Sequence, residues 1–256
     1  MSKRILVTRP YNQSTNLCRL IEQQSWQAIK FPVIDIQSKT LSDKECLSLR
    51  HIDEYKYVFF VSINAVNFAY EILNHDFECL KRVTCIAVGL ATYHQLAKYA
   101  IDNTLLPSAG FNSEGILDIP ELQDLGGQSC LIIRGEGGRE FLASTLRERG
   151  ASVDYIEVYA RIPVSYQRET INSILFAEPL DAVVIYSIEA LYNLVQIADE
   201  VNKKNNLLII PLVVISQRVC VIARSMGFTK ILIAKEATDM AMINALNNGE
   251  NCGESN

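Results

Sequence analysis

The sequence contains few of the side chains from which metal centres and disulfide frameworks are built. Its 256 residues include three histidines, and His51, His75 and His94 form no H-E-x-x-H motif. The seven cysteines are odd in number and include no C-x-x-C pair. Zinc sites and disulfide scaffolds depend on such spacings. We therefore expect no metal site, and we expect the cysteines to be free and mostly buried thiols.

Long apolar runs and an excess of positive charge are also missing. The longest apolar run, LLIIPLVVI at 207–215, is too short to span a bilayer and contains Pro211. The net charge is −5, whereas a protein that binds duplex nucleic acid needs a concentrated basic face. The first residues, MSKRILVTRP, lead directly into a strand pattern without the apolar region of a signal peptide. We expect a cytoplasmic protein that binds neither nucleic acid nor membranes, with a flexible polar tail at 247–256.

The best-known loops for phosphate binding and nucleophilic catalysis are incomplete. In RGEGGRE (134–140), the dinucleotide fingerprint G-x-G-x-x-G would need glycine in place of Glu140. GFNSEG (110–115) has the glycine spacing of a P-loop, but Ile116 and Leu117 replace its lysine and hydroxyl residue. No G-x-S-x-G nucleophile elbow occurs either. The sequence thus argues against these three kinds of site.

What the sequence does contain is a regular alternation of short apolar runs and helical patterns. Most of the runs are continuously apolar, which is typical of parallel strands covered by helices on both faces. Residues 140–149 predict a helix that Gly150 ends, with arginines in its last turn. The predicted strands are ILVT (5–8), IKFPVID (29–35), YVFFVS (57–62), CIAVG (85–89), TLLP (104–107), CLIIR (130–134), VDYIEVY (153–159), DAVVIYS (181–187), LVVIS (212–216) and KILIA (230–234).

The pattern of strands and helices repeats itself within the chain. Residues 5–36 overlay residues 130–161 at an offset of 125 (130 − 5), which pairs Arg9 with Arg134. The same offset pairs Ser62 with Ser187, and an offset of 127 overlays 86–101 on 213–228. We infer a duplicated α/β unit. The duplication leaves open whether each half forms a domain or whether the second strand of each half crosses to the other domain.

Hydroxyl and amide side chains follow several of the predicted strands. Open α/β sheets bind ligands at the carboxyl ends of their strands, so these donors predict a ligand site there. Each one, taken alone, is also a normal helix N-cap, as are Asn112 and Ser113 in GFNSEG. The donors at these positions are Ser62, Asn64, Thr92, Ser187, Ser216 and Gln217.

The turn RGEGGRE has two interpretations. Its glycines could present backbone N–H groups to a carboxylate or phosphate, beside Arg134 and Arg139. Alternatively, the turn is a tight strand-to-helix connection with solvated charges. The matched turn of the other half has Arg9-Pro10 and no glycine, so this kind of connection does not itself require glycines. Arg9 occupies the position in the repeat that matches Arg134, so it is also a candidate to bind the anion.

Taken in order, the motifs resemble uroporphyrinogen-III synthases over nearly the whole chain. They are ILVTRP, FFVSINAV, IAVGLAT, SEGIL, IIRGEGGREFLASTLRERGASVDYIEVYAR and VVISQRVCVIARSMGF. The resemblance implies two flavodoxin-like, Rossmann-like α/β domains with parallel sheets, joined by a two-stranded linker. One domain would be 1–35 plus 164–256 and the other 39–160, with linkers at about 36–38 and 161–163.

The resemblance also implies a reaction. A lyase of tetrapyrrole (haem, porphyrin) biosynthesis would close hydroxymethylbilane to uroporphyrinogen III, inverting ring D and losing water, without a metal or cofactor. A monomer would bind this substrate between its domains. Tyr159 and Thr92 match positions implicated in ligand or proton contact. The positions that match turns of the family's binding site are Ser62, Asn64, Gly89, Arg134, Gly135, Gly137, Gly138 and Arg139.

The chain departs from the family's pattern at two positions. Ile63 replaces the proline of the family's Ser-Pro-Asn turn, and Val219 replaces a hydroxyl residue at the repeat mate of Thr92. Two alternatives remain at this point. One is a cytoplasmic two-domain module that binds a small anion without chemistry. The other is a two-domain nucleotide-sugar transferase, which the missing nucleotide loop argues against.

Overall fold

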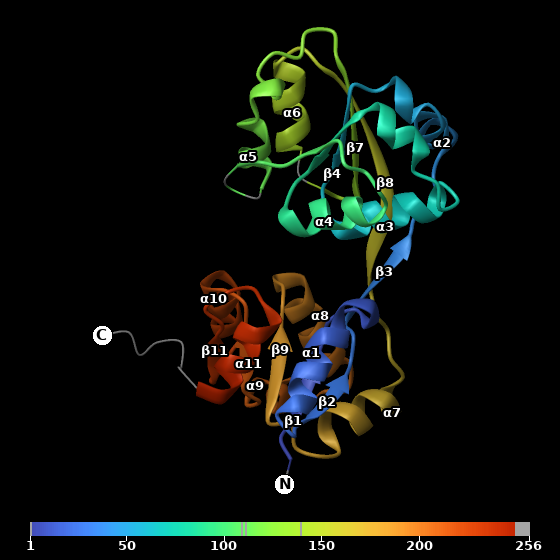
Figure 1. The fold of residues 1–256 in the computed structure, drawn as a ribbon. Helices are drawn as coiled ribbons and strands as arrows, with labels where there is room; N and C mark the ends of the chain where they lie inside the picture. Colours follow the sequence, from blue (N-terminus) through green and yellow to red (C-terminus); the bar gives the residue numbers. More distant parts are fainter. Residues whose placement is uncertain (1, 109, 111, 139, 249–256) are drawn as a thin grey trace. The chain divides into compact units, whose positions relative to one another are not determined.

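The computed structural model describes residues 2–108, 110, 112–138 and 140–248, and the chain separates into two compact units. Unit 1 comprises Met1–Asp35 and Ile162–Asn256, and unit 2 comprises Ile36–Arg161. Figure 1 shows the same division in its colours, since the dark blue start of the chain shares one unit with the orange-to-red elements, while the middle of the chain forms the other.

Unit 1 is built on a parallel sheet with the strand order β11-β10-β9-β1-β2. Its strands are β1 (Arg4–Val7), β2 (Gln27–Lys30), β9 (Ala182–Ile185), β10 (Leu212–Val214) and β11 (Ile231–Ile233). Its α-helices are α1 (Tyr11–Gln23), α7 (Arg168–Ile171), α8 (Ile188–Glu200), α9 (Lys204–Leu208), α10 (Gln217–Ser225) and α11 (Asp239–Asn248), and a π-helical turn, Asn172–Phe176, follows α7.

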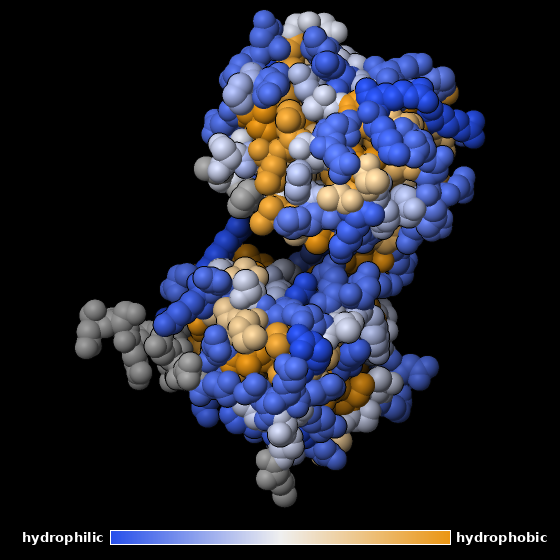
Figure 2. Space-filling model, in the orientation of Figure 1, coloured by the Kyte–Doolittle hydropathy of each residue, from blue (hydrophilic) through white to orange (hydrophobic). Residues whose placement is uncertain are grey.

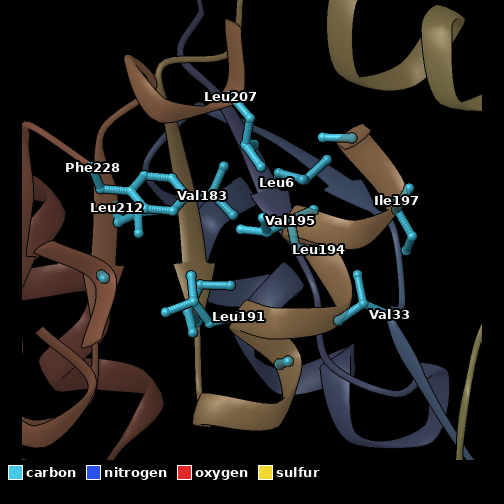
Figure 3. Close-up of a cluster of buried hydrophobic side chains, with 14 of the residues drawn as sticks. Leu6, Val33, Val183, Leu191, Leu194, Val195, Ile197, Leu207, Leu212 and Phe228 are labelled. Carbon is cyan, nitrogen blue, oxygen red and sulfur yellow. The ribbon is translucent and has the colours of Figure 1, made fainter. Parts of the chain in front are cut away.

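The continuous apolar runs of unit 1 form strands because both faces of the sheet are covered. Leu6 of β1 packs with Val183 of the neighbouring β9 and Leu212 of the next strand, β10, against α8, as Figure 3 shows. Ile5 and Val7 point to the opposite face, where they pack with residues of α1 and α11. In α8, residues 191, 194, 195 and 198 are buried, which is the spacing of one helical face.

Unit 2 is built on a second sheet with the strand order β3-β8-β7-β4-β5-β6, in which β8, β7, β4, β5 and β6 run parallel. Its strands are β3 (Ile34–Ser38), β4 (Tyr57–Phe60), β5 (Thr84–Ala87), β6 (Thr104–Leu105), β7 (Ser129–Gly135) and β8 (Ser152–Pro163). Its α-helices are α2 (Asp43–Arg50), α3 (Ile63–Ile72), α4 (Leu90–Lys98), α5 (Ser113–Leu117) and α6 (Phe141–Glu148), with 3₁₀ turns at Ile52–Glu54, Glu78–Arg82 and Pro120–Leu122.

The predicted α/β class with parallel sheets is confirmed, and one predicted strand is wrong. The run IKFPVID (29–35) is two strands, β2 and β3, which lie in different sheets. Pro32 lies between them, where the chain leaves the edge of one sheet and joins the edge of the other, and proline has no N–H to donate to a strand ladder. Residues 36–38 and 161–163, expected as linkers, are strand residues of β3 and β8.

The thiol expectation needs one correction. Cys18, Cys46, Cys79, Cys85 and Cys130 are free, but Cys220 takes part in a disulfide. Disulfides depend on the distance between two residues in space, which the spacing of cysteines along this chain does not reveal. Burial raises the pKa of the Cys85 and Cys130 thiols to about 12, so these two are poor nucleophiles. Among the residues described, no helix is long and apolar enough to cross a membrane.

Candidate functional site

Several helices of unit 2 begin at the carboxyl ends of its strands, and polar side chains cap two of these starts. Ser62 caps α3, where its hydroxyl accepts a hydrogen bond from the N–H of Ala65 at 3.1 Å. Asn112 caps α5 in the same way, accepting from the N–H of Gly115 at 2.8 Å. These caps were expected. Helix N-termini at one sheet edge supply N–H donors and positive dipole ends, which suit an anionic ligand.

A cavity of about 280 Å³ opens at this edge of the sheet. Strand ends, the glycine turn after β7 and the last part of β8 contribute to its wall. The lining residues are Val61, Ser62, Val88, Asn112, Ile132, Arg134, Gly135, Glu136, Gly137, Gly138, Leu142, Tyr159 and Arg161. The cavity therefore combines hydroxyl, amide, guanidinium and apolar groups in one place, together with the carboxylate of Glu136, which pairs with Lys39 at 3.3 Å.

Tyr159 on β8 forms one wall of this cavity and is 3% exposed. Its phenol oxygen lies 3.1 Å from the hydroxyl oxygen of Ser62. Its ring stacks on Phe68 of α3 at 5.7 Å between centroids. A Cβ at Gly135 would lie 2.5 Å from two ring carbons of Tyr159, so only glycine allows the ring to pack at this point. Gly135 also sits at a register shift between β7 and β8, where it pairs with Tyr159.

The glycine turn after β7 has a structural reason for each described glycine. Gly137 has a φ of +70°, a conformation that favours glycine. A Cβ at Gly138 would lie 2.9 Å from Cδ of Arg134, so this position leaves room for the arginine side chain. Both earlier interpretations of RGEGGRE therefore have support, because the turn is tight and it also lines the cavity. Arg139 lies outside the described residues.

Arg134 is 8% exposed and its guanidinium is engaged inside unit 2. It donates to the carbonyl oxygen of Gly138 at 3.1 Å, to Glu140 at 3.0 Å and to Glu157 at 3.2 Å. It also lies over the ring of Tyr155, 3.9 Å from the ring centroid. We expected Arg134 to offer its charge to a substrate carboxylate. In the structure, the carboxylates of Glu140 and Glu157 already bind its guanidinium.

The two carboxylates beside Arg134 are held in the ionised form. Burial opposes the charge on Glu157, but hydrogen bonds from Lys39 at 2.6 Å and from the N–H of Gly137 outweigh it, so the pKa of Glu157 is lowered. The hydrogen bond from Tyr155, followed by that from Arg134, lowers the pKa of Glu140. The turn that lines the cavity is therefore fixed by a charged network at neutral pH.

Arg9, the repeat mate of Arg134, has a similar environment in unit 1. It pairs with Asp239 of α11 at 2.9 Å and lies over the ring of Tyr186, 4.3 Å from the centroid. Tyr186 also donates to Asp239 at 2.6 Å. Burial, and then this hydrogen bond, raise the pKa of Tyr186. Arg9 therefore joins the ends of β1 and β9 to the first turn of α11.

The other predicted donors divide between the two units. In unit 1, Ser187 caps α8 at 3.0 Å and Ser216 caps α10 at 3.4 Å, and Gln217 is the exposed first residue of α10. In unit 2, Asn64 is the half-buried second residue of α3 and is not in the cavity lining.

The expected capping role of Thr92 is wrong. Gly89 occupies the N-cap of α4, and Thr92 lies one turn later, 5% exposed. Neither Gly89 nor Thr92 is among the residues that line the cavity. The extended Gly89 already begins the helix, so Thr92 is an interior residue of its first turn rather than the cap.

Sequence reasoning missed three polar residues of the cavity, Asn112 as a ligand, Glu136 and Arg161. Arg161 is exposed and follows Tyr159 by two positions on β8. Residues two apart on a strand share a face, so the sequence VYAR carried a signal that could have found it. Asn112 was predicted only as a cap, and its place in the cavity depends on the course of the loop after β6.

Exposed apolar side chains stand at the starts of three helices of unit 2. Ile63, Leu90 and Phe141 are the first residues of α3, α4 and α6, and their exposed fractions are 39%, 46% and 48%. Figure 2 shows apolar areas in orange among hydrophilic ones on the surface in view. These three residues, which we call the apolar rim, follow β4, β5 and β7, whose carboxyl ends carry the cavity.

A larger cavity, of about 560 Å³, lies in unit 2 near the amino ends of β7 and β8. Its carboxylates already have partners, since Asp154 binds Lys44 and Tyr55, and Glu54 binds His51. It lacks the converging helix N-termini of the smaller cavity. We therefore place the candidate site at the carboxyl edge. Within the described part of the chain, no cluster of ligating side chains could hold a metal ion.

Fold and site define a class: a two-unit α/β protein with a small-molecule site at the carboxyl ends of parallel strands. A sequence profile described as "Uroporphyrinogen-III synthase HemD" matches residues 16–244. The chain belongs to the uroporphyrinogen-III synthase family, whose members are lyases of tetrapyrrole biosynthesis.

Individual relatives agree with this assignment. The uroporphyrinogen-III synthase of Escherichia coli (strain K12) is 31% identical over 243 residues, which cover 94% of this chain and 99% of the relative. That of Salmonella typhimurium is 30% identical over 255 residues, with the same coverage of 94% and 99%.

Two solved structures share the fold. The uroporphyrinogen-III synthetase of Helicobacter pylori has a TM-score of 0.67 at 15% identity and covers 97% of this chain and 99% of its own. A mutant uroporphyrinogen III synthase of Thermus thermophilus has a TM-score of 0.61 at 16% identity, covering 97% and 98%.

Proposed function

We propose that this chain closes the linear tetrapyrrole hydroxymethylbilane to uroporphyrinogen III, with inversion of ring D and loss of water. Membership of the family supports the reaction. The observation that carries it to particular residues is the pair of hydroxyls, Ser62 and Tyr159, at 3.1 Å in the wall of a cavity at the strand ends. The substrate needs a proton donor at the hydroxyl that leaves, and a phenol in a water-poor wall can supply it.

The proposed first step breaks the C–O bond of the terminal hydroxymethyl group. Tyr159 gives its phenolic proton to the departing oxygen, which leaves as water, while the pyrrole nitrogen supplies electrons, keeps its hydrogen, and the ring becomes an azafulvenium cation. The substituted carbon of ring D then attacks this electrophile and gives a spiro intermediate. The bond from ring D to its original neighbour breaks, and ring D rejoins the macrocycle in the inverted orientation. The last pyrrole carbon to bond loses a hydrogen, and that proton restores Tyr159.

The rest of the cavity suits a flexible polycarboxylate with apolar rings. We propose that Asn112, Arg161 and the N–H groups at the starts of α3 and α6 bind carboxylates, since helix N-termini stabilise anions. The apolar rim would contact the faces of pyrrole rings. Holding the linear tetrapyrrole in one conformation is the larger task of the site. Without an enzyme the same substrate closes with ring D in its original orientation, which gives the type I isomer.

The deciding experiment supplies purified protein with hydroxymethylbilane and separates the oxidised products, uroporphyrins I and III, by chromatography. We expect the type III isomer to dominate. The type I isomer alone, which forms without an enzyme, would refute the proposal. A binding module for a small anion would give this second result while still retaining the substrate in equilibrium dialysis.

We also propose that the chain acts as a cytoplasmic monomer on this small-molecule substrate. Each unit has its own sheet and its own buried cores, and five of the six described cysteines are free thiols, Cys220 being the exception. Sedimentation velocity at micromolar protein concentration tests the monomer. A concentration-dependent shift to twice the mass would contradict it.

A further inference from the structure

We infer that Ser62 is a positioning residue for Tyr159: its hydroxyl donates to the phenol oxygen and thereby turns the phenolic proton toward the cavity. The inference rests on the proposed function and deepens it, since it assigns to Ser62 a task other than substrate binding. It depends on which of two oxygens donates the hydrogen bond between them, the hydroxyl oxygen of Ser62 or the phenol oxygen of Tyr159, which lie 3.1 Å apart.

The surroundings leave these two hydroxyls few choices. The oxygen of Ser62 accepts from the N–H of Ala65 at 3.1 Å, because Ser62 caps α3. Tyr159 is 3% exposed, with Phe68 on one side of its ring and Gly135 close against it. Its phenol therefore meets Ser62 and the cavity that both residues line.

Two arrangements of the protons are compatible with this contact. If Tyr159 donates, Ser62 accepts twice and the phenolic proton is withheld from the substrate. If Ser62 donates, its oxygen still accepts from Ala65, and the phenolic hydrogen is available to the cavity. An oxygen that gains charge as its C–O bond breaks needs a donor, so the bound substrate selects the second arrangement.

The second arrangement also stabilises what remains after proton transfer. Tyr159 then carries a negative oxygen in a largely dry wall, where an unpaired charge is costly. The hydrogen of Ser62 points at that oxygen, and hydrogen bonds to charged acceptors are stronger than neutral ones. Ser62 thus lowers the energy of the state in which the substrate's C–O bond has broken.

The repeat provides an internal contrast. Ser187 caps α8 with the same extended backbone and accepts from Ala190 at 3.0 Å. At the offset of 125, however, the mate of Tyr159 is Ile34 (159 − 125), which is 6% exposed. The cap is therefore a property of the duplicated fold, and the hydroxyl–phenol pair is an addition made in unit 2 alone.

The experiment compares Ser62→Ala, Ser62→Thr and Ser42→Ala in the full chain. Ser42 caps α2 of unit 2 by accepting from Glu45 at 3.3 Å and does not line the cavity, so Ser42→Ala controls for loss of a cap. We measure kcat and KM for hydroxymethylbilane, the isomer produced and the thermal midpoint. Ser62→Ala should lower kcat by about 10-fold to 100-fold with little change in KM, part of the effect of a positioned acid. Ser62→Thr, which keeps the hydroxyl, should restore kcat to within about threefold.

Two results would overturn the inference. Equal losses of kcat in Ser62→Ala and Ser42→Ala would reduce Ser62 to a helix cap. A change of KM alone in Ser62→Ala would make it a substrate ligand. Failure of the proposed function looks different, because wild-type protein would then yield only the type I isomer. If Ser62→Ala is too unstable to assay, Ser62→Gly serves instead, because glycine caps helices nearly as well and has no hydroxyl.

Discussion

Ser62 in unit 2 and Ser187 in unit 1 occupy matching positions of the internal repeat, and each caps the helix after a central strand. Only Ser62 has a phenol beside it. Where unit 2 has Gly135 against the ring of Tyr159, the matching position of unit 1 is Pro10 (135 − 125). The aromatic ring and the glycine that makes room for it are thus present together in one unit and absent together from the other.

The matched arginines teach the opposite lesson. Arg9 lies just beyond β1 and Arg134 is the penultimate residue of β7, and both pair with carboxylates of their own unit and lie over a tyrosine ring. A feature that both units share is best explained by the fold, since the two units otherwise differ at the cavity. We therefore assign the arginines to holding the strand ends together and look for catalysis in what unit 2 has alone.

The largest effect that tests this comparison is expected from Tyr159→Phe. The ring keeps its stacking on Phe68 and its place beside Gly135, so the protein should fold. Loss of the proton donor should lower kcat by roughly 10²-fold to 10⁴-fold. Steady-state kinetics with separation of the isomers measures it. Tyr55→Phe, at the opposite edge of unit 2, is the control, and equal rates in the two variants would remove Tyr159 from the mechanism.

Gly135→Ala tests whether the glycine serves the ring. The added Cβ would overlap Tyr159, so either the ring or the end of β7 must move. Overpacking of this kind costs about 1–3 kcal/mol, and the displaced phenol should lower kcat as well. Thermal unfolding and kinetics give the two readouts.

Gly126→Ala is the matched control for that substitution. A Cβ there would meet its nearest neighbour, Asp124, at an ordinary 3.6 Å, and the residue is exposed. We expect near wild-type stability and kcat in this variant. Wild-type kcat in Gly135→Ala would show that the close packing of ring and glycine has no part in the reaction.

Phe141→Ser asks whether the apolar rim contacts the substrate. Phe141 is 48% exposed at the start of α6, so its removal costs the folded protein little. If a pyrrole ring covers it, the loss of about 50 Å² of apolar contact at about 25 cal/mol per Å² corresponds to roughly a tenfold rise in KM. Val221→Ser, which alters an exposed apolar residue on α10 of unit 1, should leave KM unchanged. An equal KM in both variants would argue against the rim.

Much of the fold could be predicted from the sequence, because continuous apolar runs and a repeat of 125 residues are visible in one chain. Pro32 is evident in the sequence as well, yet the apolar run around it predicted one strand where the structure has two, β2 and β3. The site was harder. Its turn could be found from RGEGG, but the fate of Arg134 depends on Glu157, 23 residues later on a neighbouring strand. Thr92 could not be separated from Ser62 by pattern, since both follow a strand, and only the backbone shows that Gly89 is the cap.

The smallest expected effect concerns acid stability and separates the two arginine networks. The pKa of Glu157 is lowered in the folded protein, so its contribution to stability is complete above the ordinary value of 4.5 and is lost as the pH falls through the folded value. Wild-type unit 2 should therefore lose stability below about pH 4.5, and Glu157→Gln should flatten that decline while costing stability at neutral pH. Glu71→Gln, which removes an exposed carboxylate of α3, is the reference.

The two units can be followed separately in that titration. The single tryptophan, Trp26, lies in unit 1, so its fluorescence reports that unit, while hydrogen exchange of peptides from β7 and β8 reports unit 2. Glu157→Gln should change the exchange of β7 and β8 with pH and leave the tryptophan transition where it was. If both probes shift together, the charged network beside Arg134 stabilises the whole chain rather than the turn that lines the cavity. The contrast between the units would then lie in the Ser62–Tyr159 pair alone.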